Sequence, residues 1–243
     1  MVMDTTHSQK SHRNRGRVFF ELFLLWIVVL LAIRMTVFVQ QFFSLSELLL
    51  GIVPVLFMYA PVWLCSLRGV SSWDYHLSVP AFRDGQAWFT ALKIAAVVSV
   101  MTWVLFIPVY HYYMTIVWEK SWVGVLPEQL LLTVMYHLFY VAIPEEFFYR
   151  GYFQTRLNEV FSKDWSVFGV SMGWGSIWAN VFFAFGHSVV QFQWWHFSIF
   201  LPGMLFSWMR ERTNGVLAGA FLHAGFNIGI VVLDTLYGVR SPV

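Results

Sequence analysis

The stretch QLLLTVMYHLFYVAIPEEFFYR, residues 129–150, is apolar enough for a membrane-spanning helix but ends in two adjacent glutamates and an arginine. One acidic residue at the centre of a membrane helix costs ~2.5–3.5 kcal/mol on translocon-type scales, so such carboxylates usually face a functional site inside the protein. Glu145 and Glu146 are therefore the first candidates for chemistry. The alternative is an acidic pair at the membrane edge that Arg150 neutralises.

The composition is that of an integral membrane protein. Of the 243 residues, 58% are hydrophobic and 12% are charged, against roughly 25% charged residues in soluble domains. The net charge is only +2 and the basic residues form no dense cluster, which argues against nucleic-acid binding. The single cysteine, Cys65, excludes an intrachain disulfide and a cysteine-based zinc cluster.

Seven apolar stretches predict an all-α, polytopic membrane helical bundle with about seven transmembrane helices, the range being six to eight. They run over residues 18–39, 45–67, 87–110, 129–148, 174–193, 195–209 and 215–236. We start the fifth stretch near Trp174, so that His187 stays within the membrane. Residues 164–173 then form an interfacial or re-entrant piece.

The basic residues predict the orientation of the bundle. With the N-terminus in the cytoplasm, only Lys120 and Arg240 fall in external segments, as the positive-inside rule requires. We interpret Arg34 and Lys93, within the spans, as side chains that snorkel to the interface. The expected location is a bacterial plasma membrane, with the C-terminus outside. We expect one structural domain with a basic cytoplasmic tail at 1–17, N-terminal membrane helices at 18–124, a membrane core at 125–236 and a C-terminal tail at 237–243.

The two glutamates have different helical neighbours. In a helix, Glu146 and Arg150 share a face and can form an ion pair, whereas Glu145 is rotated about 100° away. Glu146 is then held ionised, and Glu145 is freer to exchange protons. Pro144 removes a backbone donor and favours a kink that would turn the carboxylates into a cavity.

Two later stretches carry polar side chains as well. FAFGH, residues 183–187, ends in His187, and HAGFN, residues 223–227, places His223 and Asn227 four residues apart on one helix face. Each alone is more simply interpreted as a hydrogen-bonded packing group. Because buried polar groups need partners, all three stretches together predict one shared cavity.

The three motifs resemble those of a known family of membrane proteins. Glu-Glu-x-x-x-Arg at 145–150, Phe-x-x-x-His at 183–187 and His-x-x-x-Asn at 223–227 follow one another in the order typical of the CPBP family of intramembrane proteases. That family includes type II CAAX prenyl endopeptidases and bacterial abortive-infection and lysostaphin-resistance proteins. The resemblance covers roughly residues 125–235.

The resemblance implies roles for the motif residues. Glu145 is similar to the general base that activates water, and His187 to its partner in holding that water. Glu146 and Arg150 resemble the pair that supports the site. Peptide hydrolysis needs a base and hydrogen-bond donors directed at the developing negative charge, so these residue types suit the chemistry.

His223 and Asn227 resemble the groups that stabilise the oxyanion. Whether metal takes part is open: Glu145, His187 and His223 could bind zinc with water as the fourth ligand, but the chain has no His-Glu-x-x-His motif. We favour activation of water by glutamate and histidine with no cofactor required.

The sequence thus predicts an intramembrane endopeptidase that acts on a membrane-associated peptide or protein, either lipidated or bearing a sorting tail. The competing hypotheses are a non-catalytic immunity factor or scaffold that uses the same polar cluster structurally, and a transporter, which the absence of a repeat disfavours. We interpret His76, His111 and His196 as interfacial residues and His137 as a residue that could support the site.

Overall fold

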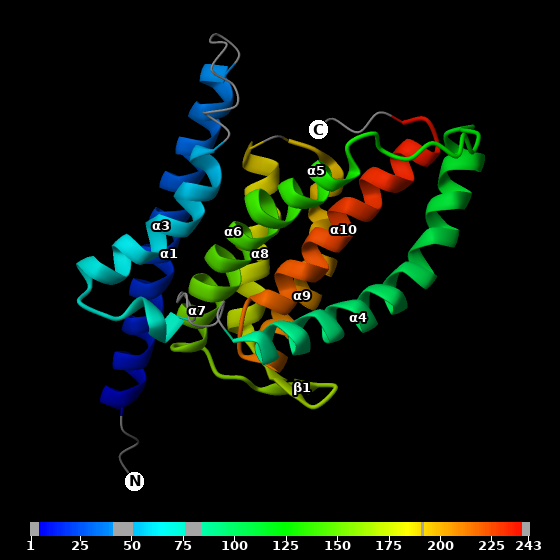
Figure 1. Cartoon of the computed structure of the whole chain (residues 1–243). Helices are drawn as coiled ribbons and strands as arrows, with labels where there is room; N and C mark the ends of the chain where they lie inside the picture. The colour runs from blue at the N-terminus through cyan, green and yellow to red at the C-terminus, as the bar shows by residue number, and fades with distance from the viewer. Residues whose placement is uncertain (1–4, 41–50, 76–83, 191, 240–243) are drawn as a thin grey trace.

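The computed structural model describes residues 5–40, 51–75, 84–190 and 192–239, and the fold over these residues is almost wholly helical (Figure 1). His76 and Arg240, used in the sequence analysis, lie outside the described residues. The first half contains α1 (Thr5–Gln40), α3 (Ile52–Leu67), the 3₁₀ helix η1 (Ser72–Tyr75), α4 (Gly85–Tyr112) and the π-helical turn η3 (Tyr113–Val117).

The fourth apolar stretch forms one long helix that changes its winding several times. Its segments are α5 (Leu130–Met135), η4 (Tyr136–Ala142), α6 (Ile143–Glu146), η5 (Phe147–Gln154) and α7 (Thr155–Asn158), of which η4 and η5 are π-helical. Pro144 lies in the first turn of α6, between the two π-helical segments. Both glutamates therefore lie where the winding changes, and such π-helical insertions often mark functional sites.

The remaining elements are a short hairpin and four helices. They are β1 (Trp165–Val167), β2 (Val170–Met172), α8 (Trp174–Val190), the 3₁₀ helix η6 (Trp194–Ile199), α9 (Phe200–Thr213) and α10 (Leu217–Leu236). The predicted start of the fifth stretch at Trp174 is confirmed, because α8 begins there. The piece at 164–173 is an antiparallel hairpin in which Trp165 pairs with Met172, a strand structure that the sequence analysis did not predict.

A helical membrane bundle is confirmed, whereas the number of seven spans stays a prediction. By length and composition, four helices could cross a membrane, at Asn14–Val39, Gly85–Val117, Leu130–Asn158 and Leu217–Leu236. The described parts of the other three apolar stretches are also helical, in α3, α8 and η6 with α9, but these helices are shorter. Helix α1 begins at Thr5, so the described part of the predicted tail continues the first membrane helix.

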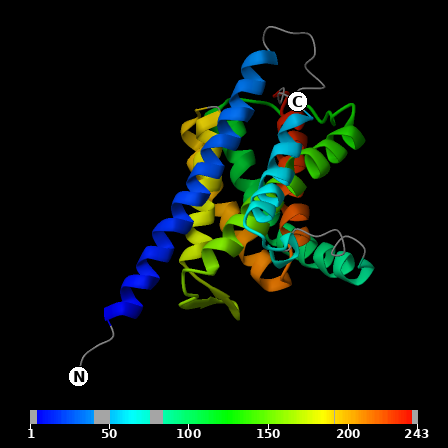
Figure 2. The same cartoon turned by 90° about the vertical axis from the view of Figure 1, so that its left-hand side faces the viewer.

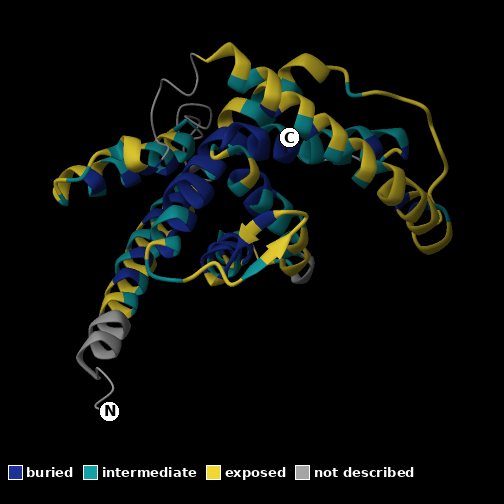
Figure 3. Cartoon of the chain, turned by 90° about the horizontal axis from the view of Figure 1, so that it is seen from below, coloured by how far each residue is buried: buried dark blue, intermediate teal, exposed yellow. Residues whose placement is uncertain are grey.

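The core surrounds the second half of the long helix. Every residue of η5 is buried, and α3, α8 and α9 pack against it while α10 packs against η4 and α6. Seen from below, the buried residues gather where these helices meet (Figure 3). Phe148, Tyr149 and Phe153 of η5 contact one another, and Tyr149 also contacts Phe183 of α8, with ring centroids 4.7–5.8 Å apart. Aromatic packing therefore fixes the helix that carries Glu145 and Glu146.

The two ends of the molecule are distinct. α1 starts at one end and α10 finishes at the other (Figures 1 and 2). A polar cluster around Glu211, at the end of α9, lies at the end where α1 starts: its carboxylate accepts hydrogen bonds from Gln154, Asn158 and Lys163 at 2.6–2.8 Å. Burial raises the pKa of Glu211, but Arg210 and the hydrogen bonds from Lys163 and Gln154 outweigh it, so this pKa lies below its usual value.

Candidate active site

Three helices bring one carboxylate and two imidazoles together. Glu145 Oε2, on α6, lies 3.9 Å from Nε2 of His187 on α8 and 3.9 Å from Nε2 of His223 on α10. In the described part of the chain this oxygen has no hydrogen-bond partner. A separation of 3.9 Å is too long for a direct hydrogen bond, yet both groups can reach one shared water at about 2.8 Å.

The other ring nitrogens define the tautomers of the two histidines. Nδ1 of His187 lies 2.9 Å from the carbonyl oxygen of Phe183, which can only accept, so Nδ1 carries the proton. Nδ1 of His223 lies 3.1 Å from Oε1 of Glu146 and donates to that carboxylate. In the neutral form of His187, Nε2 is therefore the acceptor. The Nε2 atoms of both histidines face Glu145 Oε2.

Glu146 and Arg150 form a fully buried ion pair behind these groups. Arg150 Nη1 lies 3.2 Å from Glu146 Oε1, and neither side chain is exposed. Arg150 Nη2 donates to Asn180 Oδ1 and to the carbonyl oxygen of Gly203, both at 3.0 Å. The guanidinium also lies over the Phe183 ring at 4.2 Å, a cation–π contact. Glu146 thus links Arg150 to Nδ1 of His223.

Two glycines let α9 and α10 approach this pair. A Cβ atom at Gly203 would lie 2.2 Å from Asn180 Oδ1 and 3.1 Å from Arg150 Nη2. A Cβ atom at Gly219 would lie 2.9 Å from Glu146 Oε2. The sequence analysis missed the contribution of Asn180 and Gly203. Asn180 lies seven residues before His187, on the same face of α8, and a buried amide at that spacing is the signal that could have found it.

Asn227 lies one helical turn beyond His223 on α10 and is partly buried. Over the residues that the structure describes, its side chain makes no hydrogen bond and no contact with Glu145 or His187 is recorded. The structure thus gathers Glu145, Glu146, Arg150, His187 and His223 into one cluster and leaves Asn227 beside it. The catalytic roles of all six side chains stay predictions.

A cavity of about 290 Å³ opens at Glu145 and His187. Its polar side chains are Glu145, Tyr149, His187 and His196. The rest of the wall is mostly apolar and comes from α1, α3 and α8, through Leu30, Ile33, Val53, Phe57 and Val190. Side-chain exposure follows this cavity: 30% for His187 and 15% for Glu145, against 6% for His223. An apolar segment of a substrate can therefore lie beside the carboxylate.

Two other histidines differ in their relation to the site. The ring of His196, on η6, lies 5.9 Å from the ring of His187, because η6 packs back against α8. His196 therefore also lines the cavity, and its interpretation as an interfacial residue stays a prediction. His111 contacts the Tyr237 hydroxyl near the end of α10, away from the cluster. Nδ1 of His137 is buried and has no hydrogen-bond partner among the described residues.

The candidate zinc set shows the right donor types, with Glu145 Oε2 3.9 Å from each of the two Nε2 atoms. Imidazole Nε2 atoms whose Nδ1 protons are held by a carbonyl and a carboxylate are typical of zinc ligands and their supporting groups. In the described ranges, however, no group of three His, Cys, Asp or Glu side chains is placed to hold a metal ion.

Comparison with known proteins identifies the region that carries this cluster. The family model described as type II CAAX prenyl endopeptidase Rce1-like matches residues 127–229. Comparisons with curated proteins and with solved structures give no match. The matched region contains all three motifs and lies within the predicted membrane core at 125–236. The predicted resemblance to CPBP proteases is thus confirmed by a match to the Rce1-like type II CAAX prenyl endopeptidase model over residues 127–229, which include Glu145, His187 and His223.

Proposed function

We propose that this integral membrane protein is an intramembrane endopeptidase in which Glu145 and His187 activate a water molecule. The observation that carries the proposal is the position of Glu145 Oε2, which faces Nε2 of His187 and Nε2 of His223 at the edge of a largely apolar cavity. Glu145 is accessible from this cavity, whereas Glu146 is fully buried. This accessibility favours the protease hypothesis over the scaffold hypothesis, because a catalytic carboxylate has to meet its substrate.

In the first step, Glu145 takes a proton from water while Nε2 of His187 accepts the second O–H as a hydrogen bond. The water oxygen forms a bond to the carbonyl carbon, and the carbonyl oxygen becomes an oxyanion. The carbon–nitrogen bond then breaks, and the leaving amine takes the proton from Glu145. The products are a carboxylate and an amine, and no serine or cysteine nucleophile is needed.

The oxyanion requires donors, and we assign them to His223 and Asn227. His223 already uses its Nδ1 proton on Glu146, so it would donate from Nε2 in its doubly protonated form. The amide of Asn227, one turn further on the same face of α10, offers two further N–H groups. Donors fixed before the reaction stabilise such an anion without reorganisation. In this scheme Glu146 and Arg150 are positioning residues.

The substrate that fits is a membrane-associated peptide whose apolar or lipidated part enters from the bilayer. The cavity wall formed by α1 and α3 supplies the apolar surface, and Glu145 and His187 lie at its polar edge. The family match supports a CAAX-type substrate. The positive-inside pattern supports an N-terminus in the cytoplasm, which puts the start of α1 on that side.

We favour a mechanism that needs no metal, because one water between Glu145 and Nε2 of His187 can donate one hydrogen to each of these groups at their present spacing. Hydrolysis should then continue undiminished in a chelated preparation in which metal analysis finds no zinc. Activity that disappears on chelation and returns with zinc would contradict this choice.

The test of the function compares membrane-protein termini in cells that produce the wild-type chain or Glu145→Ala. We expect new termini in the wild-type sample that the variant lacks, and the sequences around them would define the substrate. Identical termini in both samples, with equal amounts of folded protein, would contradict a protease function.

A further inference from the structure

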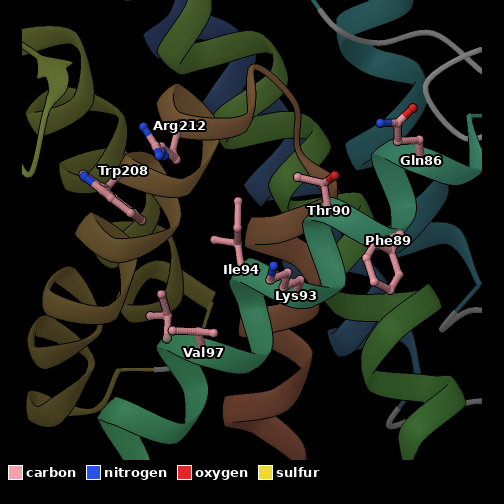
Figure 4. A pocket seen from close by; sticks show the side chains of 9 residues that line it. Gln86, Phe89, Thr90, Lys93, Ile94, Val97, Trp208 and Arg212 are labelled. Carbon is pink, nitrogen blue, oxygen red and sulfur yellow. The ribbon is translucent and has the colours of Figure 1, made fainter.

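A second, larger cavity lies between α4 and α9, away from the proposed active site (Figure 4). Its volume is about 590 Å³, and it shares no lining residue with the cavity at Glu145. Helix α4 lies at the outside of the bundle (Figure 1), and only 6% of its most apolar window is buried. This cavity is therefore a groove that faces the lipid.

The polar side chains of the wall on α4 lie near the start of the helix. Gln86, Thr90 and Lys93 come from this part, together with two apolar residues, and only apolar residues follow, at Val97 and Val98. From Gln86 to Val97 these positions recur at three- and four-residue intervals, so they share one face of the helix. The groove thus has its polar groups near the start of α4 and an apolar end towards the middle of this candidate span.

The wall on α9 has the same polarity. Arg212 lies in the last turn of α9, and Trp208 lies one turn further in, with its indole N–H held by the Val167 carbonyl at 2.9 Å. The start of α4 and the end of α9 lie at the same end of the molecule (Figure 1). The two polar ends therefore coincide.

Both cations of the groove lack an anion. Lys93 and Arg212 are exposed side chains, and in the ranges that the structure describes neither forms an ion pair. Lys93 lies eight residues into α4, or about 12 Å from its start at 1.5 Å per residue. A cation at that depth in a membrane helix needs an anionic partner or must snorkel.

We propose that this groove binds an anionic phospholipid. The headgroup phosphate lies between Lys93 and Arg212, with Gln86 and Thr90 as further hydrogen-bonding groups, and an acyl chain runs along Val97. The two cations at the polar end match the negative charge of the headgroup, and the apolar wall beyond them matches the acyl chain. The proposal does not depend on the protease function.

Native mass spectrometry of the detergent-solubilised full chain, with phosphatidylglycerol or phosphatidylcholine added, tests the proposal. The test variant is Lys93→Gln/Arg212→Gln, and the matched control is Arg17→Gln/Lys120→Gln, which removes one exposed arginine and one exposed lysine elsewhere. We expect the wild type and the control to retain phosphatidylglycerol in preference to phosphatidylcholine. In the test variant, the ratio of retained phosphatidylglycerol to retained phosphatidylcholine should fall about tenfold.

Two additional samples distinguish binding of the whole lipid from binding of its phosphate group alone. Excess glycerol phosphate should not displace the lipid, and Val97→Trp, which fills the apolar end, should weaken lipid retention. Equal preference in the test variant and the control would overturn the proposal. So would complete displacement by glycerol phosphate, since the acyl chain would then contribute nothing.

Discussion

Glu145 and Glu146 are neighbours in the sequence and lie in opposite environments. Glu146 is fully buried, and one of its oxygens faces both Arg150 Nη1 and His223 Nδ1 within 3.2 Å. Glu145 lies at the edge of a cavity, with one oxygen that faces Nε2 of two imidazoles. One helical step therefore separates a carboxylate that is enclosed in the core from a carboxylate that a cavity reaches.

The largest expected effect is on cleavage, and it should be accompanied by a loss of stability at only one of the two histidines that face Glu145. His187→Gln should lower cleavage by about 10²–10⁴-fold, the usual contribution of a group that assists proton transfer, and should leave folding intact. His223→Gln should lower both cleavage and the stability of the fold, because His223 also binds Glu146. Counts of substrate termini and unfolding temperatures in the same membranes would check this. An equal loss of stability in both variants would remove the distinction.

The next effect concerns the buried pair itself. Arg150→Gln should destabilise the fold by ~3–5 kcal/mol, because it leaves the Glu146 carboxylate buried without its charged partner. Arg17→Gln, the same substitution at an exposed position, is the control and should change stability by ~0.5 kcal/mol or less. Denaturant unfolding in mixed micelles measures both. A small effect at Arg150 would mean that Glu146 is satisfied in another way.

The sequence motifs predicted this division only in part. The spacing of Glu146 and Arg150 predicted their ion pair, and the depth of His187 predicted that α8 starts at Trp174, because both follow from helical geometry. Asn180 and Gly203, which bind Arg150, are distant in sequence from it and carry no local signal. The number of spans is still harder to predict, because α3, α8 and α9 are each shorter than the roughly 20 residues that a helix needs to cross a bilayer.

His196 shows the same limit. Its place in the sequence, near the end of an apolar stretch, predicts an interfacial residue. It reaches the cavity because η6 packs back on α8, a tertiary contact that helical periodicity does not encode. The hairpin at 165–172 was missed for a similar reason: its three-residue strands are too short to show alternation.

A smaller effect should appear at low pH in the Glu211 cluster. The pKa of Glu211 is lower in the folded chain than in the unfolded chain, so its carboxylate stabilises the fold above its unfolded pKa. This contribution should disappear as the pH falls through the folded pKa. Unfolding temperatures of wild type and Glu211→Gln, measured from neutral to acidic pH, should converge as the pH falls. A constant difference between them would contradict the linkage.

The smallest effect is expected at His196. Its ring lies 5.9 Å from that of His187, on the wall of the cavity, so we expect it to contact the substrate and not the activated water. His196→Ala should raise KM several-fold with little change in kcat, the behaviour of a group that binds ground state and transition state alike. A matching fall in kcat would give His196 a part in the chemistry.

The most direct test compares Glu145→Gln with Glu146→Gln, which make the same change one residue apart. Cleavage and unfolding are measured for both in the same membranes. The division described above predicts that Glu145→Gln loses cleavage by about 10²-fold or more at an unchanged unfolding temperature, whereas Glu146→Gln unfolds at a markedly lower temperature. Retained cleavage by a folded Glu145→Gln protein would contradict the assignment of Glu145 as the base.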